Sequence, residues 1–296
     1  MTFSHIVIFG AGAIGSTYGA ILSEKHDVTL IGRPAHMNAV RKNGLTIVGD
    51  AAGTYQVATA TEIKKILPQT LLLVTMKAHH LHDALTSIRG LIQKDTTILL
   101  LQNGLGIKEV AQKALKSKKN IVCGIVAFGA EFLEPGRIYA RLGFTFLDSD
   151  IPSKEIAQFF QSSGLSVLNS VDFQTDVWRK VVINCVANPL SAILQSPTKQ
   201  LVSPHLTSIR KRIVEECIAV GRAEGVDLDL SLLEIMDTQF PNFENRTSML
   251  QDILRGRKTE IEFLNGKIVE LGTRHKIPTP VNETLTQLIH FLEDRI

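Results

Sequence analysis

Cysteine is scarce in this sequence, with Cys123, Cys185 and Cys217 the only three among 296 residues. Their odd number, their wide spacing and the lack of a Cys-x-x-Cys pair exclude the usual disulfide frameworks and cysteine zinc sites. Because free cysteines are typical of a reducing compartment, we expect a cytoplasmic protein.

Long apolar runs and an excess of one charge are also lacking. The longest apolar runs, such as residues 121–130, are well short of the roughly 20 residues that a membrane-spanning helix needs. No basic segment with a cleavage site precedes the first strand pattern, so we expect no secretory signal. A net charge of +3, from 32 basic and 29 acidic residues, is too small to indicate a nucleic-acid surface. We therefore expect neither a membrane nor a nucleic acid as partner.

Residues 6–24 carry the pattern of a dinucleotide-binding loop. A short apolar run predicts a strand, Gly-Ala-Gly-Ala-Ile-Gly follows, and the next nine residues are compatible with a helix. The first glycine allows the turn, the second lets the backbone approach a pyrophosphate, and the third lets helix and strand pack closely. The helix N-terminus offers its N–H groups to the anion. The cofactor contacts expected from this loop are Gly10, Ala11, Gly12, Ala13, Ile14 and Gly15.

The end of the second predicted strand, residues 28–31, indicates which dinucleotide binds. An NAD site usually has Asp or Glu there to hold the ribose hydroxyls, whereas this chain reads Ile-Gly-Arg33-Pro. An arginine suits the 2′-phosphate of NADP because its planar fork of N–H donors pairs with phosphate oxygens. We therefore expect NADP(H) as the cofactor, with Arg33 among its contacts.

Two further predicted strands, residues 71–75 and 97–101, are each followed by a polar residue. Lys77 follows the first strand, and Asn103 follows the second in a Gln-Asn-Gly-Leu-Gly loop. Ligands of open α/β sheets bind at the carboxyl ends of strands, so we expect Lys77 and Asn103 where cofactor and substrate meet. The nearby histidines lack the spacing of a ligand set, so we expect no metal. The other elements predicted here are a hairpin at 45–60 that turns near 49–53, strands at 121–128, 137–146 and 166–168, and a helix at 153–162.

The patterning changes from strands to helices near residues 169–172. Beyond that point apolar residues recur at three- and four-residue spacing, as in residues 209–220 and 285–292. Domains usually hold about 100–200 residues, so a chain of this length should form two. We predict a Rossmann-type α/β domain at residues 1–170 that binds NADP, followed by a mainly α-helical domain at residues 171–296 that binds substrate and carries out catalysis.

An otherwise apolar helix pattern at residues 178–190 carries polar side chains. Lys180, Asn184 and Asn188 are four residues apart, so they share one helix face. Burying such groups costs several kcal/mol unless each has a partner. The stripe indicates either a small polar substrate or a structural network to other helices, and this segment alone does not decide between them. Pro189 disfavours helical geometry at the preceding residue, so we expect a kink there.

A second polar cluster contains two matches to a capping box, Ser-x-x-Gln at residues 248–251 and Thr-x-x-Glu at residues 259–262. On one straight helix Ser248 and Glu260 would lie roughly 18 Å apart, too far to share a small substrate. We therefore predict a helix break between residues 254 and 259. A helix N-terminus at Ser248 would favour a substrate carboxylate.

In this order, and along nearly the whole chain, these motifs resemble those of ketopantoate reductase, also called 2-dehydropantoate 2-reductase. The glycine loop is generic, but two stretches are specific: Trp178-Arg-Lys-Val-Val-Ile-Asn-Cys-Val-Ala-Asn-Pro-Leu, and Ser248-Met-Leu-Gln-Asp followed by Thr-Glu260-Ile-Glu-Phe-Leu-Asn-Gly. The resemblance implies NADPH-dependent reduction of ketopantoate to pantoate, on the route to pantothenate and coenzyme A. It also implies a Rossmann domain followed by a helical one.

The resemblance further implies roles for the matching residues. Lys180 would be the general acid on the ketone oxygen, and Glu260 would be a partner of Lys180 or of the substrate. The ammonium would stabilise the charge that hydride transfer leaves on oxygen, and a neighbouring carboxylate would raise the lysine pKa and keep it protonated. Thr198 stands where the family often has Asn, so the resemblance does not carry over the substrate contact at that position. The other implied contacts are Asn103, Asn184, Asn188, Asn245 and Ser248 for the substrate, and Asn103 and Lys77 for the cofactor.

Two other functions remain open at this point. A reductase of the same fold would act on another 2-oxo acid, because pocket shape sets specificity. A non-catalytic NADP-sensing protein would use the glycine loop for binding alone, although such a protein has no use for a proton donor. The expected partner is a small 2-oxo acid, and the sequence leaves the oligomeric state open, with a homodimer as one option.

Overall fold

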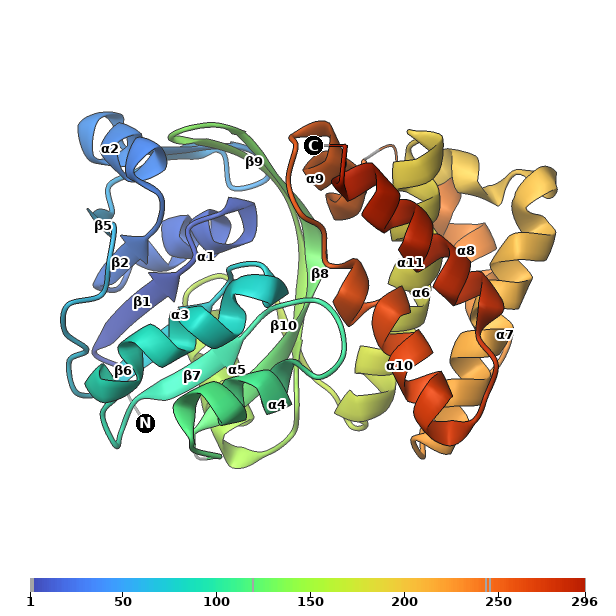
Figure 1. Cartoon of the computed structure of the whole chain (residues 1–296). Coiled ribbons are helices and arrows are strands. Elements are labelled where there is room, and N and C mark those ends of the chain that lie inside the picture. The colour runs from blue at the N-terminus through green and yellow to red at the C-terminus, as the bar shows by residue number, and fades with distance from the viewer. Residues whose placement is uncertain (1–2, 119, 243, 245, 296) are drawn as a thin grey trace. The chain divides into compact units, whose positions relative to one another are not determined.

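The chain is described by a computed structural model that covers residues 3–118, 120–242, 244 and 246–295. Contacts divide it into two compact units, both drawn in Figure 1. Unit 1 holds the residues up to Gln102 together with Gly106–Phe173. Unit 2 holds Asn103–Leu105 together with the residues from Gln174 onward.

Unit 1 is built on a mixed sheet. In the described part of the chain its ten strands are paired in the order β4-β3-β9-β8-β7-β6-β1-β2-β5, and β10 pairs with β9. The parallel set β5-β2-β1-β6-β7-β8 has the 3-2-1-4-5-6 order of a dinucleotide-binding fold. The strand order therefore reverses between β1 and β6, and their carboxyl ends mark the expected ligand site.

The strands are β1 His5–Phe9, β2 Val28–Ile31, β3 Leu45–Gly49, β4 Gly53–Tyr55, β5 Ala58–Ala60, β6 Thr70–Val74, β7 Thr97–Leu100, β8 Ile121–Glu134, β9 Arg137–Leu147 and β10 Val167–Asn169. The helices of unit 1 are α1 Ala13–Ser23, α2 Pro34–Asn43, α3 Leu81–Ile88, α4 Ile107–Leu115 and α5 Ile151–Ser162, with short 3₁₀ turns η1 Ala78–His80 and η2 Arg89–Leu91.

The core of unit 1 lies around the central strands and α1. Strands β6 and β7 are buried along their whole length, as expected for parallel strands covered on both faces. Helix α1 packs against β1 and β2 and also contacts β8 and β9, the long ribbon that Figure 1 shows curving beside it. Tyr18 of α1 is fully buried, and its hydroxyl bonds that of Thr145 in β9 at 2.5 Å.

The strands predicted in unit 1 are present, but the hairpin predicted at residues 45–60 is only partly right. Strands β3 and β4 pair antiparallel as expected, whereas β5 pairs in parallel with β2 instead of joining the hairpin. The reason is topological, because β5 is the third strand of the dinucleotide fold. Strand β8 also runs past its predicted end because β9 pairs with it as far as Glu134.

Unit 2 is mostly helical, as its patterning predicted. Helices α7, α10 and α11 pack against one another (Figure 1), and their apolar faces share one core with α6. The helices are α6 Phe173–Leu194, α7 Thr207–Ala223, α8 Ser231–Gln239, α9 Ser248–Leu254, α10 Asn265–His275 and α11 Pro280–Glu293, with 3₁₀ turns η3 Thr198–Val202, η4 Pro204–Leu206, η5 Phe240–Asn242 and η6 Ile261–Phe263.

Helix α6 is continuous over 22 residues and contains Pro189. The kink expected at this proline does not interrupt the helix. Lys180, Asn184 and Asn188 are therefore carried on one face of a single helix, as their spacing predicted.

The break predicted between residues 254 and 259 is confirmed. Helix α9 ends at Leu254, and the next helical turn, η6, begins at Ile261. Gly256 has a φ of +62°, and its N–H donates to the Ile253 carbonyl at 3.1 Å. A glycine in this left-handed conformation is a common way to end a helix, because it has no Cβ to clash.

Both predicted capping boxes at this break are wrong in detail. Thr247, not Ser248, caps α9, because the Thr247 hydroxyl accepts from the N–H of Leu250 at 3.3 Å. Ser248 is the first helical residue instead. Thr259 accepts from the N–H of Ile261 at 3.2 Å and precedes a single 3₁₀ turn, whereas the α-helix starts only at α10.

Candidate active site

In unit 1 the glycine loop joins the carboxyl end of β1 to the start of α1. Gly10 has a φ of +115°, and its N–H and that of Ala11 donate to the Ile31 carbonyl at 3.1 and 2.8 Å. Helix α1 begins at Ala13, with Gly12 as its N-cap residue. The first N–H groups of a helix have no acceptors within it, so they are available to an anion. The loop therefore has the geometry that holds a pyrophosphate.

Two glycines of this loop differ in what surrounds them. A Cβ atom on Gly15 would lie within 3.0 Å of the Thr75 hydroxyl and the Gly10 carbonyl, so only glycine lets α1 pack this closely. A Cβ atom on Gly12 would meet only the Gly10 carbonyl oxygen, at 3.9 Å. The open space beside Gly12 is where a pyrophosphate would approach the backbone, so the loop fits a dinucleotide.

The two predicted cationic contacts of the cofactor also lie in unit 1. Arg33 comes two residues after β2, is exposed and is the N-cap residue of α2. Lys77 comes three residues after β6 and precedes η1. Because β2 and β6 are the two neighbours of β1, both residues follow strands that flank the glycine loop. In folds of this topology the carboxyl ends of these strands border the ligand crevice.

In unit 2 the loop that follows β7 docks on the 3₁₀ turn η6. The N–H of Leu105 donates to the Phe263 carbonyl at 3.0 Å. Gly104 has a φ of +103°, and a Cβ there would collide with Phe263, so the docking needs this glycine. The loop brings the amide of Asn103 to the carboxylate of Glu260, with an N–H···O distance of 3.5 Å between Nδ2 and Oε2. Glu260 is itself buried.

Lys180, on α6, interacts electrostatically with Glu260. Part of Lys180 stays accessible, yet burial lowers the pKa of its ammonium from 10.5 to about 8, against an opposing, raising effect of Glu260. The predicted effect of the carboxylate is therefore right in sign. The expectation of a raised pKa is wrong, because desolvation of the ammonium outweighs the attraction. With a pKa of about 8, the protonated form of the lysine still predominates at pH 7.

Two amides, Asn184 and Asn188, follow Lys180 on the same face of α6. Asn188 is buried and Asn184 is partly exposed. Across the described residues, neither side chain takes part in a hydrogen bond with another side chain or with the backbone. A structural network through these amides is therefore not observed. A bound polar ligand would offer hydrogen-bond partners to both amides.

Three other residues considered for the substrate site differ in position and burial. Ser248 is exposed at the first position of α9. Thr198 begins η3 and is buried. Asn245 lies outside the described residues.

Two buried amides of unit 2 were not singled out from the sequence. Asn265 and Asn282 have no accessible surface, and they bond to each other with a distance of 2.9 Å between Nδ2 and Oδ1. They lie on different helices, 17 residues apart, and no periodic spacing signals such a pair. The only local signal was the Asn-Gly pair that begins at Asn265.

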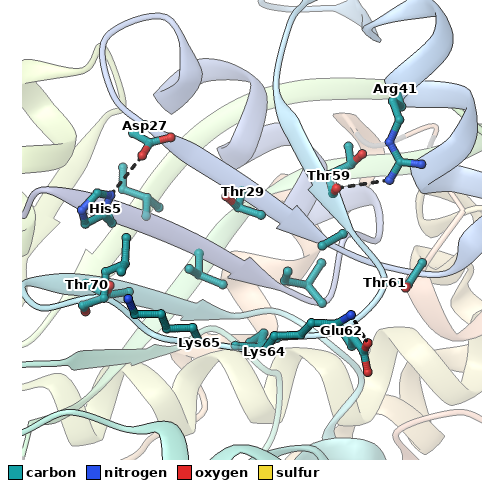
Figure 2. Close-up of a pocket in the computed structure, with 16 residues that line it drawn as sticks. His5, Asp27, Thr29, Arg41, Thr59, Thr61, Glu62, Lys64, Lys65 and Thr70 are labelled. Carbon is teal, nitrogen blue, oxygen red and sulfur yellow. Dashed lines mark hydrogen bonds and ion pairs between the residues drawn. The ribbon is translucent and has the colours of Figure 1, made fainter.

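A pocket of about 480 Å³ lies elsewhere in unit 1 and includes none of the predicted site residues (Figure 2). Its charged side chains are mostly paired with each other. His5 contacts Asp27 at 3.0 Å, and Lys64 contacts Glu62 at 3.3 Å. Its chemistry gives no reason to assign it a ligand, and it is not part of the candidate site.

Two other features are absent from the described part of the chain. Within the ranges that the structure describes, no group of three or more His, Cys, Asp or Glu side chains could hold a metal ion. Among the same residues, no helix combines the length and the apolar character needed to cross a membrane.

Comparison with known proteins identifies the family. Residues 6–147 match the family model described as ketopantoate reductase PanE/ApbA, and residues 172–293 match the model of its C-terminal part. The chain belongs to the ketopantoate reductase family. Members of this family are oxidoreductases, and the family assignment agrees with the resemblance that the motifs indicated.

Individual relatives support this assignment. The 2-dehydropantoate 2-reductase of Pyrococcus horikoshii is 34% identical over 293 residues, which is 96% of each chain. A PanE/ApbA family ketopantoate reductase from Ralstonia eutropha has a similar structure, with a TM-score of 0.91 and 29% identity over 98% of this chain and 99% of that one. D-mandelate dehydrogenase, solved with NADH and anilino(oxo)acetate, gives a TM-score of 0.92 with 28% identity and the same coverage.

Proposed function

We propose that this chain is an NADPH-dependent reductase that converts 2-dehydropantoate (ketopantoate) into pantoate. The observation that carries the proposal is the cluster in unit 2 where Lys180 is influenced by the buried Glu260, which also accepts from Asn103. The names of the relatives support the same reaction. Pantoate would feed pantothenate and coenzyme A synthesis in the cytoplasm, a compartment that suits the free cysteines. A homodimer remains a prediction.

Lys180 is the general acid of the proposed reaction. A bound reduced nicotinamide supplies a hydride to the ketone carbon. The ammonium of Lys180 stabilises the negative charge that develops on the ketone oxygen and gives its proton to that atom. Glu260 opposes the loss of this proton by raising the lysine pKa, and the Asn103 amide helps to hold the Glu260 carboxylate in place.

The polar groups of the substrate are bound by the remaining residues of unit 2. Asn184 and Asn188 each offer an amide with both donor and acceptor atoms, which suits the hydroxyl and carboxylate of a small 2-oxo acid. We propose Ser248 and Asn245 as further substrate contacts. A threonine at position 198 is shorter than the asparagine frequent in the family and has a single hydroxyl, so the substrate contact there differs.

The proposed cofactor is a nicotinamide dinucleotide, and we favour NADP(H) because of Arg33. Arg33→Ala should raise the KM for NADPH about tenfold or more while changing the KM for NADH little, because the guanidinium pairs only with the 2′-phosphate. Steady-state kinetics with both cofactors measure this difference.

Arg41→Ala is the matched control for this experiment. Arg41 is an exposed arginine in the last turn of α2, the helix that Arg33 caps. Its guanidinium donates to Asn38 and to the Thr59 carbonyl. Its removal should leave the preference between the cofactors unchanged. An equal effect of Arg33→Ala on both cofactors would refute the NADP assignment, a relevant outcome because the similar D-mandelate dehydrogenase was solved with NADH.

The substrate is tested by NADPH consumption across a panel of 2-oxo acids that includes ketopantoate and phenylglyoxylate. We expect ketopantoate to give the highest kcat/KM. A reductase of another 2-oxo acid is the second candidate, favoured by the likeness to D-mandelate dehydrogenase and by Thr198. Higher kcat/KM for another acid would establish that candidate. Tight NADPH binding without turnover of any acid would instead favour a sensing protein.

A further inference from the structure

Helix α6 lacks one backbone hydrogen bond because it contains a proline. A proline has no N–H, so Pro189 cannot donate to the carbonyl of Cys185 four residues earlier, as the α-helix requires. Cys185 is fully buried, so water does not satisfy this carbonyl. A buried carbonyl without a donor would destabilise the turn between the two residues.

The missing donor is replaced by a side chain from another helix. Nδ2 of Asn265, the first residue of α10, donates to the Cys185 carbonyl oxygen at 3.0 Å. The second hydrogen of the same nitrogen goes to Oδ1 of Asn282, at 2.9 Å. Asn265 therefore uses both hydrogens of its amide nitrogen, and among the described residues its amide oxygen has no partner.

A carboxylate fixes the far end of this chain of hydrogen bonds. Nδ2 of Asn282, in α11, donates to Oε2 of Glu216 in α7 at 2.7 Å. The backbone N–H groups of Val281 and Asn282 also donate to the Glu216 carboxylate, each at 2.9 Å. Charged acceptors make the stronger hydrogen bonds, so α7 and α11 hold Asn282 firmly in place. Asn265 is in turn oriented by Asn282.

The turn of α6 whose carbonyl accepts from Asn265 lies next to the proposed substrate amides. Asn184 immediately precedes Cys185, and Asn188 immediately precedes Pro189. We propose that Asn265 is a positioning residue of the reductase: by supplying the hydrogen bond that Pro189 cannot make, it fixes the turn of α6 that presents Asn184 and Asn188 to the substrate. This inference rests on the proposed function, because it assigns both amides to substrate binding.

The test is a double-mutant cycle on the full-length protein with NADPH and ketopantoate. Asn265→Leu removes the donor and keeps a similar volume, and it should raise the KM for ketopantoate about tenfold while leaving the KM for NADPH unchanged. Pro189→Ala restores a backbone N–H opposite the Cys185 carbonyl. The double variant should therefore recover most of the lost substrate affinity, which a purely structural role of Asn265 does not predict.

Asn242→Leu is the matched control. Among the described residues this exposed amide of unit 2 donates only to the Thr238 carbonyl, so its loss should not change either KM. A double variant no better than Asn265→Leu would overturn the proposal, as would an unchanged KM in the single variant. If Asn265→Leu fails to fold, the double variant still tests the proposal. Its restored backbone N–H should let it fold and reduce ketopantoate. Wild-type turnover of ketopantoate, measured first, tests the proposed function separately.

Discussion

Lys180→Ala should lower kcat for ketopantoate reduction by about two orders of magnitude or more, the usual contribution of a positioned acid. The loss should appear in kcat because the ammonium acts on charge that develops only as the hydride arrives. NADPH affinity should stay near the wild-type value, since the glycine loop and Arg33 belong to unit 1 and Lys180 to unit 2. Stopped-flow kinetics and NADPH fluorescence titration measure the two effects.

The neighbouring residue provides the control for that experiment. Arg179→Ala removes a cation of the same helix that is exposed and ion-paired with Asp176 at 3.5 Å. Its kcat should remain within about twofold of wild type, because exposed ion pairs contribute little. Near-normal turnover by Lys180→Ala would end the assignment of Lys180 as the general acid.

The pH dependence gives an independent signature of Lys180. Its protonated form is the active one, so kcat/KM should fall as pH rises through the lysine pKa of about 8. Glu260→Gln removes the carboxylate that raises this pKa. The basic limb of the profile should therefore move to lower pH in that variant, whereas a limb that stays in place would argue that Glu260 does not act on Lys180.

The dinucleotide half of the fold could be predicted because its signals are local. The glycine loop lies between one strand and one helix, and the strand order follows once β1 and β2 are recognised. The spacing of Lys180, Asn184 and Asn188 was likewise sufficient to place them on one helix face. The cap of α9 was missed by one residue because Thr247 and Ser248 are both good caps, and only the backbone angles choose between them.

Other features depend on contacts between residues that are distant in sequence. The sequence does not indicate that His36 accepts from the N–H of Gly136 at 2.9 Å and bonds the Ser16 hydroxyl at 3.0 Å, or that burial lowers the pKa of His36 to about 4. The pKa of Lys180 was misjudged for the same reason. Its carboxylate partner could be inferred from the motifs, but the extent of its desolvation depends on all the side chains around it.

Two glycine substitutions in the same loop should affect different properties, one the affinity for the cofactor and the other the stability of the fold. Gly12→Ala adds a methyl group in open space at a φ of −87°, which alanine tolerates, so the melting temperature should change little. The same methyl group would stand between the backbone and the pyrophosphate, so the KM for NADPH should rise about tenfold or more. Gly15→Ala instead forces a methyl group against Thr75 and the Gly10 carbonyl, and such overpacking costs about 1–3 kcal/mol.

Thermal unfolding and NADPH titration of the two variants separate these roles. Gly15→Ala should lower the melting temperature by several degrees, about 2–4 °C per kcal/mol for a unit of this size. Gly12→Ala should fold normally and lose cofactor affinity, which links this glycine to the ligand through space that only the pyrophosphate would fill. A Gly12→Ala variant with wild-type NADPH affinity would show that the pyrophosphate does not approach there, and the dinucleotide site would have to be placed elsewhere in unit 1.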